Sequence, residues 1–333
     1  MAYFYANDSF LRGIRKTNMH QTLQAPNTIL MVRPGAFYPN PDTQSCNGFQ
    51  SKALSTSHHQ SLLLKAQTEF DQVEAALLEV GIEVNVFQDS PNPAKPDAIF
   101  PNNWFSTHAN GAVVIYPMFS PARRHEKAAY SEIEGFLSKA YDIDKCIDLS
   151  HYEQQSRFLE GTGVLCIDHI NKTAYVGLSN RADAGLVEEV CGILKLTPII
   201  FSTELPDQKA VYHTNVMLSI GTEFALLGAD MMASVEQRNH IIHSLEASGK
   251  TVILLSNQQV AEFAANAIEL TGTEGRYLAI SQRGRDSLTS KQVSAIEAHA
   301  SLLSVPLSTV ELSGGSMRCM IAGIHLPERQ NRP

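Results

Sequence analysis

Three polar residues, two of them in the second half of the chain and one near its middle, carry the groups needed for covalent catalysis. Cys319 follows a glycine loop, SGGS at 313–316, where backbone N–H groups can face a ligand, and its neighbour Arg318 supplies a positive charge that favours the reactive thiolate. His213, in VYHTNVML, can move protons near neutral pH, and Glu160, in FLEGTGVL, offers a carboxylate. A thiol, an imidazole and a carboxylate together suit reactions at an sp² carbon. Taken singly, the cysteine could also be an inert buried thiol and the histidine a structural residue.

These residues share a regular spacing. Glu160 and His213 are 53 positions apart, and further steps of 53 reach Asn266, in FAANAIEL, and Cys319. A step of 57 back from Glu160 reaches Asn103, in FPNNWFSTH. The alternative is that Asn266 falls on the period by chance. A repeated unit that cannot bury its sheet alone packs against its neighbours around an axis, so the spacing predicts five units whose polar positions meet in one pocket.

The segments between these positions predict alternating strands and helices. β-branched runs predict strands at 28–32, 84–87, 112–116, 197–201 and 251–255, and amphipathic stretches predict helices at 61–80, 122–140, 183–195, 234–248 and 288–303. Two hairpins, at 165–179 and 216–229, are each followed by a helix and a strand. We therefore expect an α/β propeller with fivefold pseudosymmetry, built of ββαβ units. It would form a single domain over residues 1–333, its last unit completed by the N-terminal strand and helix.

Composition excludes several classes of protein. The 333 residues are 44% hydrophobic and 18% charged, which is typical of a globular protein rather than a disordered one. The net charge of −8 without a basic block argues against nucleic acid or an anionic membrane as partner and favours a small molecule. No membrane-length apolar run or secretory signal is present, so we expect a cytosolic protein. The five cysteines form no C-x-x-C, and the histidines lack metal-site spacing, so we expect no metal.

The order of these motifs resembles that of the guanidine-modifying (pentein) enzymes, which include arginine deiminase, dimethylargininase, succinylarginine dihydrolase and the amidinotransferases. The similarity is strongest to a bacterial branch described as citrulline-hydrolysing or amidinotransferase-like, and it extends from MVRPGAFYPNPDTQSCNGFQ to GGSMRCMIAGIHLP. The resemblance implies a fivefold α/β propeller that hydrolyses C–N bonds without a cofactor. It further implies that Cys319 is the nucleophile, that His213 is the acid and base, and that Glu160 holds the reacting group of the substrate.

Four further positions are implied by the same resemblance. Arg123, in PARRHE, and Arg181, in GLSNRAD, lie where arginine deiminase places arginines that bind the substrate carboxylate. A forked guanidinium matches a carboxylate through two parallel hydrogen bonds. Asp97, in PDAIFPNN, is a candidate acceptor for an α-ammonium group, and Asn47, in SCNGFQ, is a candidate pocket residue.

The chain departs from arginine deiminase at the positions that face a guanidinium. Asn103 and Asn215 stand where the deiminase has aspartates, and Gly163 replaces a further acid. A buried cation needs carboxylates, whereas a neutral ureido group needs one donor and one acceptor, which an asparagine amide provides. The substitutions therefore favour a neutral ureido compound, either as substrate or as a retained intermediate.

Four functions follow in order of preference. The first is hydrolysis of citrulline to ornithine, ammonia and CO2, and the second is an arginine dihydrolase or deiminase. An amidinotransferase, in which an amine replaces water, is third, and a non-catalytic binding propeller is the least favoured. A homo-oligomer is compatible with the sequence, which does not fix the oligomeric state.

Overall fold

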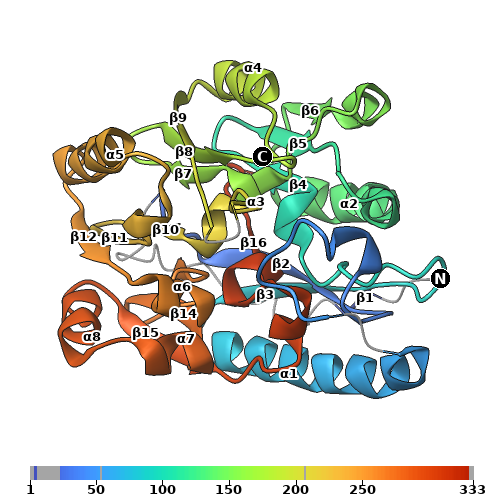
Figure 1. The fold of residues 1–333 in the computed structure, drawn as a ribbon. Helices are drawn as coiled ribbons and strands as arrows, with labels where there is room; N and C mark the ends of the chain where they lie inside the picture. The colour runs from blue at the N-terminus through green and yellow to red at the C-terminus, as the bar shows by residue number, and fades with distance from the viewer. Residues whose placement is uncertain (1–3, 6–22, 53–54, 206–207, 330–333) are drawn as a thin grey trace.

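Five small β-sheets surround a common centre in the computed structural model, which describes residues 4–5, 23–52, 55–205 and 208–329 (Figure 1). Four of these sheets have three strands each. Their strands are β4 (Phe105–Thr107), β5 (Ala112–Ile115) and β6 (Lys145–Asp148); β7 (Cys166–Asp168), β8 (Thr173–Leu178) and β9 (Thr197–Ser202); β10 (Leu218–Ile220), β11 (Phe224–Leu227) and β12 (Thr251–Leu254); and β13 (Ile268–Thr271), β14 (Arg276–Ser281) and β15 (Ser301–Val305).

Each of these sheets has the same connectivity. The first two strands form an antiparallel hairpin, and the third pairs in parallel with the second after a helical crossover. The fifth sheet repeats the pattern with strands from both ends of the sequence. Its β16 (Ala322–Gly323) is antiparallel to β2 (Thr28–Arg33), and β2 is parallel to β3 (Glu83–Gln88), with β1 (Phe4–Tyr5) at the edge. The predicted propeller of five ββαβ units is confirmed.

The helices that follow the second strands lie on the outside of the ring (Figure 1). They are α1 (His59–Glu79), α2 (Tyr130–Ala140), α4 (Ala184–Leu194), α5 (Val235–Ala247) and, after the shorter α7 (Gln282–Ser287), α8 (Ser290–Glu297). Asp183 begins α4 by accepting a hydrogen bond from the backbone N–H of Leu186, and Ser234 begins α5 in the same way. Among the described residues, no helix is both long and apolar enough to cross a membrane.

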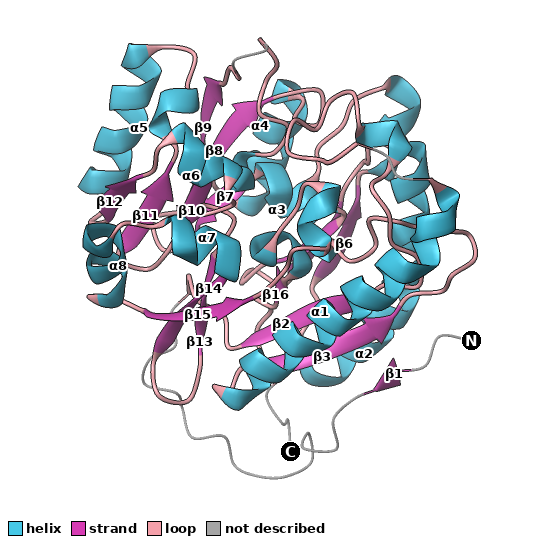
Figure 2. Cartoon of the chain, turned by 60° about the horizontal axis from the view of Figure 1, so that its bottom comes forward, coloured by secondary structure: helices cyan, strands magenta, loops and turns pink. Residues whose placement is uncertain are grey.

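Helix α1 shows how a unit is held to the ring. Its buried residues recur every three or four positions, which places them on one face of the helix: Leu62, Ala66, Phe70, Val73 and Leu77. This face belongs to an apolar cluster that includes residues of β2, β3, β14 and β15. Figure 2 shows the sheet of β13, β14 and β15 beside the sheet of β2 and β3. The fourth and fifth units are therefore joined through a shared core.

The predicted strands at 28–32, 84–87, 112–116, 197–201 and 251–255 are confirmed as β2, β3, β5, β9 and β12. The predicted C-terminal boundary of the helix at 288–303 is wrong, because α8 ends at Glu297 and residues 301–305 form β15. A short apolar run does not by itself distinguish the end of a helix from a buried strand.

The helix expected at 122–140 is α-helical only from Tyr130, and Pro121–Ala129 forms a 3₁₀ helix (η5). Side chains three positions apart eclipse each other on a 3₁₀ helix. Arg123 and Glu126 therefore both point into the protein, where they are buried and form an ion pair. This local geometry shapes the site described next.

Candidate active site

The polar residues on the repeat period occupy equivalent places in the five units. Each lies just before the innermost strand of its unit: Asn103 before β4, Glu160 before β7, His213 before β10, Asn266 before β13 and Cys319 before β16. Short helical turns precede four of these strands, at Pro101–Asn103 (η4), Gly161–Val164 (α3), Thr214–Val216 (η7) and Met317–Met320 (η10). The repeat thus places chemically useful side chains at one end of the inner strands.

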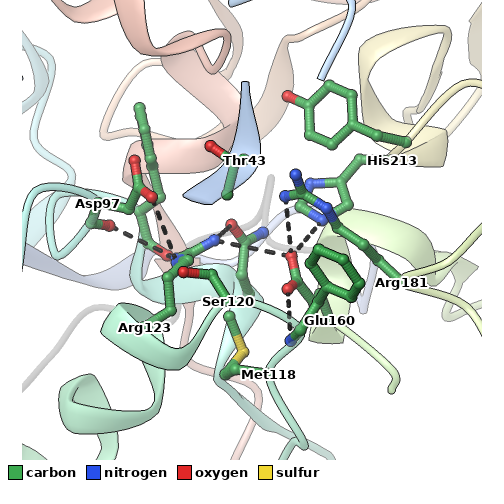
Figure 3. A network of polar contacts seen from close by, with 12 residues as sticks. Thr43, Asp97, Met118, Ser120, Arg123, Glu160, Arg181 and His213 are labelled. Carbon is green, nitrogen blue, oxygen red and sulfur yellow. Dashed lines mark hydrogen bonds and ion pairs between the residues drawn. The ribbon is translucent and has the colours of Figure 1, made fainter. Parts of the chain in front are cut away.

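Glu160 is the centre of a buried network of charges (Figure 3). Its Oε2 accepts hydrogen bonds from Nε2 of His213 at 2.7 Å and from Nη1 of Arg181 at 3.3 Å, and Nη1 of Arg123 lies 3.8 Å away. Its Oε1 accepts a hydrogen bond from the backbone N–H of Phe119 at 3.0 Å. Burial raises the pKa of this carboxyl, but Arg181, His213 and Arg123 outweigh that effect and hold the pKa well below its usual range. Glu160 is therefore a carboxylate.

His213 is a neutral imidazole with a defined tautomer. Burial, partly offset by Glu160, lowers the pKa of His213 to about 4. Because the Glu160 carboxylate only accepts hydrogen bonds, Nε2 of His213 carries the proton and Nδ1 carries the lone pair. Gly163 lies directly beside this atom, since a Cβ there would be 2.8 Å from Nδ1 and 2.5 Å from Nδ2 of Asn103. Gly163, which the sequence indicates as the replacement of an acidic residue, is therefore also required because a side chain there would clash with His213 and Asn103.

The sulfur of Cys319 is surrounded by neutral amides. Nδ2 of Asn215 and Nδ2 of Asn266 lie 3.4 and 3.3 Å from Sγ, at hydrogen-bonding distance for sulfur. Oδ1 of Asn266 accepts a hydrogen bond from the backbone N–H of Ser316 at 3.2 Å, which ties this amide to the glycine loop. Asn266 was not among the predicted site residues, although the spacing of 53 pointed to it.

The two arginines have different surroundings, although sequence assigned them the same role. Arg123 donates to both carboxylate oxygens of Glu126 at 2.9 Å, to Oδ1 of Asn103 at 2.7 Å and to the carbonyl of Phe100 at 3.1 Å. With Glu160 also near Nη1, its donors are all directed at protein atoms. Arg123 therefore lines the cavity with its hydrogen-bond donors already occupied by protein atoms.

Arg181 keeps a donor unused. Its Nη1 donates to Glu160 and its Nη2 to Sγ of Cys46 at 3.1 Å, but its buried Nε has no hydrogen-bond partner among the described residues. The guanidinium lies over the ring of Tyr212, 4.9 Å from its centroid. The hydrogen bond from Arg181 to the thiol of Cys46 is weaker than a hydrogen bond from Arg181 to a carboxylate. A substrate carboxylate would therefore bind Arg181 more strongly than this thiol does.

Asp97 and Asn47 lie at the margin of the site. Oδ2 of Asp97 accepts a hydrogen bond from Nδ2 of Asn40 at 2.7 Å, and burial raises the pKa of Asp97 despite the nearby Arg123. Nδ2 of Asn47 donates to the carbonyl of Ser313 at 3.3 Å. A Cβ on Gly314, whose φ is +80°, would lie 2.4 Å from that nitrogen, so this glycine permits both the turn and the contact.

One small cavity brings these residues together. Its lining includes Asn47, Asp97, Asn103, Arg123, Arg181, His213 and Cys319. Glu160 and Asn215 lie behind it, hydrogen-bonded to His213 and Cys319. The cavity volume of about 20 Å³ has room for roughly one water molecule, so an amino acid enters only if the surrounding segments move. No cluster of three or more metal-ligating side chains occurs in the described ranges.

The fold and these clustered side chains define a guanidine-modifying enzyme of the pentein superfamily. A family model described as "N,N dimethylarginine dimethylhydrolase, eukaryotic" matches residues 33–326, and the chain belongs to this family. It is a hydrolase that acts on C–N bonds other than peptide bonds. No curated protein matches the chain in a sequence search.

Solved structures share the fold at low sequence identity. The substrate-bound N-terminal domain of ArgZ, an arginine dihydrolase from the ornithine–ammonia cycle in cyanobacteria, has a TM-score of 0.71 and 14% identity, covering 90% of this chain and 98% of that one. AgrE in complex with L-arginine has a TM-score of 0.71 and 15% identity, covering 91% of this chain and 41% of the longer AgrE. The citrulline complex of dimethylargininase (DDAH) from Pseudomonas aeruginosa has a TM-score of 0.61 and 14% identity, covering 90% of this chain and 99% of that one.

Proposed function

We propose that the protein hydrolyses the ureido group of an amino acid, with citrulline as the leading substrate, through a covalent intermediate on Cys319. The observation that carries the proposal is the charge balance of the site. Glu160 is held by His213 and two arginines, and Glu126 is paired with Arg123.

A guanidinium and a ureido group make different demands on such a site. A buried guanidinium without a free carboxylate costs several kcal/mol. Of the residues that line the cavity, Asp97 alone is acidic, and it faces two cationic residues, Arg123 and Arg181. A neutral ureido group avoids this cost, and the amides of Asn215 and Asn103 match its donor and acceptor atoms.

The first chemical step forms a bond between Sγ of Cys319 and the ureido carbon. Nδ1 of His213 takes the thiol proton, and the amides of Asn215 and Asn266 stabilise the sulfur as a thiolate. Backbone N–H groups of the glycine loop stabilise the oxyanion of the adduct, a contribution of about 3 kcal/mol for each donor. His213 then returns the proton to one departing nitrogen, which leaves either an S-carbamoyl or an alkyl-thiocarbamate enzyme.

The second step uses water. His213 accepts a proton from the water, the resulting hydroxide attacks the thiocarbamate carbon, and the Cys319 thiolate leaves and takes the proton back from Nδ1 of His213, which restores the starting enzyme. The released carbamic acid decomposes to CO2 and an amine. Glu160 keeps Nε2 of His213 protonated throughout, so Nδ1 remains the atom that exchanges protons. From citrulline, the sum of the two steps is one ornithine, one ammonia and one CO2.

We assign recognition of the amino-acid end of the substrate to Arg181 and Asp97. Arg181 has the unpaired Nε and a weak thiol partner, so a substrate carboxylate can replace Cys46. Asp97 lies on the same cavity and can accept an ammonium group. Asn47 holds the glycine loop and Arg123 holds Glu160 and Asn103, so both are positioning residues.

Arginine dihydrolysis is the second candidate, because the ArgZ fold neighbour is an arginine dihydrolase. In that case citrulline would be an intermediate that the same neutral amides retain for a second hydrolysis. Methylated arginine is a further substrate to test, because the matching family model is named for dimethylarginine hydrolysis.

Product analysis separates these functions. The purified protein is incubated separately with citrulline, arginine, dimethylarginine and agmatine, and ornithine, citrulline and ammonia are measured. The proposal expects equal amounts of ornithine and ammonia from citrulline, with a higher kcat/KM than for arginine. Conversion of arginine or dimethylarginine to citrulline with no consumption of citrulline would overturn it. Turnover that requires glycine or ornithine as acceptor would instead identify an amidinotransferase.

A further inference from the structure

A second cavity lies along the axis of the propeller and shares no lining residue with the cavity of Cys319. Its volume is about 60 Å³, and the innermost strands of all five sheets, β4, β7, β10, β13 and β16, contribute to its wall. The proposed chemistry uses none of its side chains. We therefore asked which ligand its charges and hydrogen-bonding groups would fit.

Arg318 gives this cavity a positive charge. Although it precedes Cys319 in sequence, its side chain lines the axial cavity, where Nη1 donates to the carbonyl of Ile321 at 2.9 Å. No aspartate or glutamate is among the lining residues, and Arg318 forms no ion pair with any residue in the described ranges. Arg318 is partly buried, and this partial desolvation lowers its pKa. An anion would offset the cost of this desolvation.

Three histidines on the same cavity supply further hydrogen-bonding groups. His108 and His169 directly follow β4 and β7, and His325 lies two residues after β16. The rings of His169 and His325 stack with their centroids 4.0 Å apart, which aligns their edges. Burial, with a smaller contribution from neighbouring charges, lowers the pKa of His108 and of His169 to about 3. The imidazoles are therefore neutral at neutral pH, and each carries one N–H group. His325 is already hydrogen-bonded to the backbone of Leu23, and Nε2 of His108 lies 2.7 Å from Oγ of Ser106, so His169 is the histidine left to donate to a ligand.

The size of the cavity limits the ligand. A volume of about 60 Å³ accommodates a group of a few heavy atoms, and it excludes an amino acid or a nucleotide. The planar fork of a guanidinium binds two oxygens of a planar anion through parallel hydrogen bonds. A metal cation is unfavourable beside Arg318.

We propose that the axial cavity is a binding site for a small oxyanion of the size of bicarbonate or nitrate, with Arg318 as the charged ligand and His169 as an additional N–H donor. The site is distinct from the cavity of Cys319, and the proposal does not depend on which substrate the enzyme hydrolyses.

Calorimetric titration with sodium nitrate and with sodium bicarbonate tests the proposal. Sodium gluconate, whose anion is too large for the cavity, keeps the ionic strength constant. We expect saturable binding of both anions to the wild-type protein and a loss of affinity of about tenfold or more in Arg318→Gln. The control is Arg329→Gln, which removes an exposed arginine that pairs with Asp142 at the surface. Equal affinity in Arg318→Gln and wild type, or no saturable binding to wild type, would overturn the site.

A structure of the wild-type protein crystallised with nitrate decides the question even if Arg318→Gln fails to fold. The proposal predicts trigonal density in the axial cavity with oxygens about 2.9 Å from the Arg318 guanidinium nitrogens. Nitrate found only in the cavity of Cys319 or on the surface, with water alone beside Arg318, would contradict it.

Discussion

The candidate active site has two halves with opposite electrostatic character. Around Glu160, a carboxylate, two guanidinium groups and an imidazole are in contact within the protein interior. Around Sγ of Cys319, the polar side chains within hydrogen-bonding distance among the described residues are the uncharged amides of Asn215 and Asn266. This difference between the two halves indicates that the buried charges of the site mainly stabilise one another. In the proposed reaction, the reacting group of the substrate would meet neutral partners at the sulfur.

The substitution Cys319→Ser is the strongest test of the half of the site around Sγ of Cys319, which we call the sulfur half. We expect kcat with citrulline to fall by about 10³-fold or more, because the hydroxyl is a much weaker nucleophile at neutral pH. The melting temperature should stay close to that of wild type, since the two side chains have similar size. Cys146→Ser, at an exposed cysteine, is the control and should keep full activity. Substantial turnover by the Cys319 variant would remove the nucleophile assignment.

The substitution Glu160→Gln tests the half of the site around Glu160, which we call the charged half. The substitution leaves Arg181 and Arg123 without their shared counter-charge, so we expect a loss of about 3–5 kcal/mol in the free energy of unfolding at pH 7, together with a large loss of kcat. Urea unfolding measures the first effect. Glu223→Gln removes one partner of an exposed ion pair and should cost only about 0–1 kcal/mol. Similar losses in the two variants would show that the Glu160 network is not stabilising.

The same variant gives a pH signature. The pKa of Glu160 in the folded protein is depressed, so its stabilising contribution is complete above the unfolded value of about 4.3 and is lost as the pH falls toward the lower folded value. The stability difference between wild type and Glu160→Gln should therefore be constant from pH 7 to about 5 and narrow at about pH 3. A difference that stays constant into acid would contradict the assignment of Glu160 as the ionised partner.

The neutrality of the sulfur half is tested by adding a carboxylate. Asn215→Asp places a negative charge next to Sγ, so we expect the ratio of kcat/KM for arginine over citrulline to rise by about tenfold to a hundredfold. Asn103→Asp, at the other substituted position, should shift the ratio less, because Arg123 already donates to this side chain and would neutralise the new charge. Equal changes in kcat/KM for both substrates in both variants would refute the electrostatic argument.

The smallest expected effect on kinetics is that of replacing Arg181, and it distinguishes the role of Arg181 from that of Arg123. Arg181→Gln should raise KM for citrulline about tenfold with a smaller change in kcat, because the unpaired donor is available to a substrate carboxylate. Arg123→Gln should instead reduce stability, since it leaves Glu126 buried without its partner. Steady-state kinetics and thermal unfolding of both variants make the comparison. A KM effect confined to Arg123→Gln would reverse the assignment.

Much of the fold could be predicted because its signals are local. β-branched runs marked the strands, and the spacing of 53 between Glu160, His213, Asn266 and Cys319 marked equivalent points of successive units. The end of α8 was missed because Leu302 and Leu303 fit either the apolar face of a helix or a half-buried strand. The cytosolic location stays a prediction.

The arginines show where sequence reasoning stops. Arg123 and Arg181 each follow a recognisable motif, but their roles depend on partners that motifs do not reveal. Glu126 reaches Arg123 because residues 121–129 form a 3₁₀ helix, and Cys46 reaches Arg181 from a segment 135 positions away in sequence. Asn266 lies on the predicted period, but one asparagine on a period is weak evidence for a site residue, and its amide is seen beside the sulfur only in the structure.

The central claim is most directly tested by trapping the covalent intermediate. The enzyme is mixed with citrulline labelled with ¹³C in the ureido group, quenched in acid within milliseconds to seconds, digested and mapped by mass spectrometry. We predict a transient ¹³C-labelled thiocarbamate on the peptide that contains Cys319, absent from the peptides of the other four cysteines. Turnover of citrulline with no labelled cysteine, or with the label on another cysteine, would contradict the account.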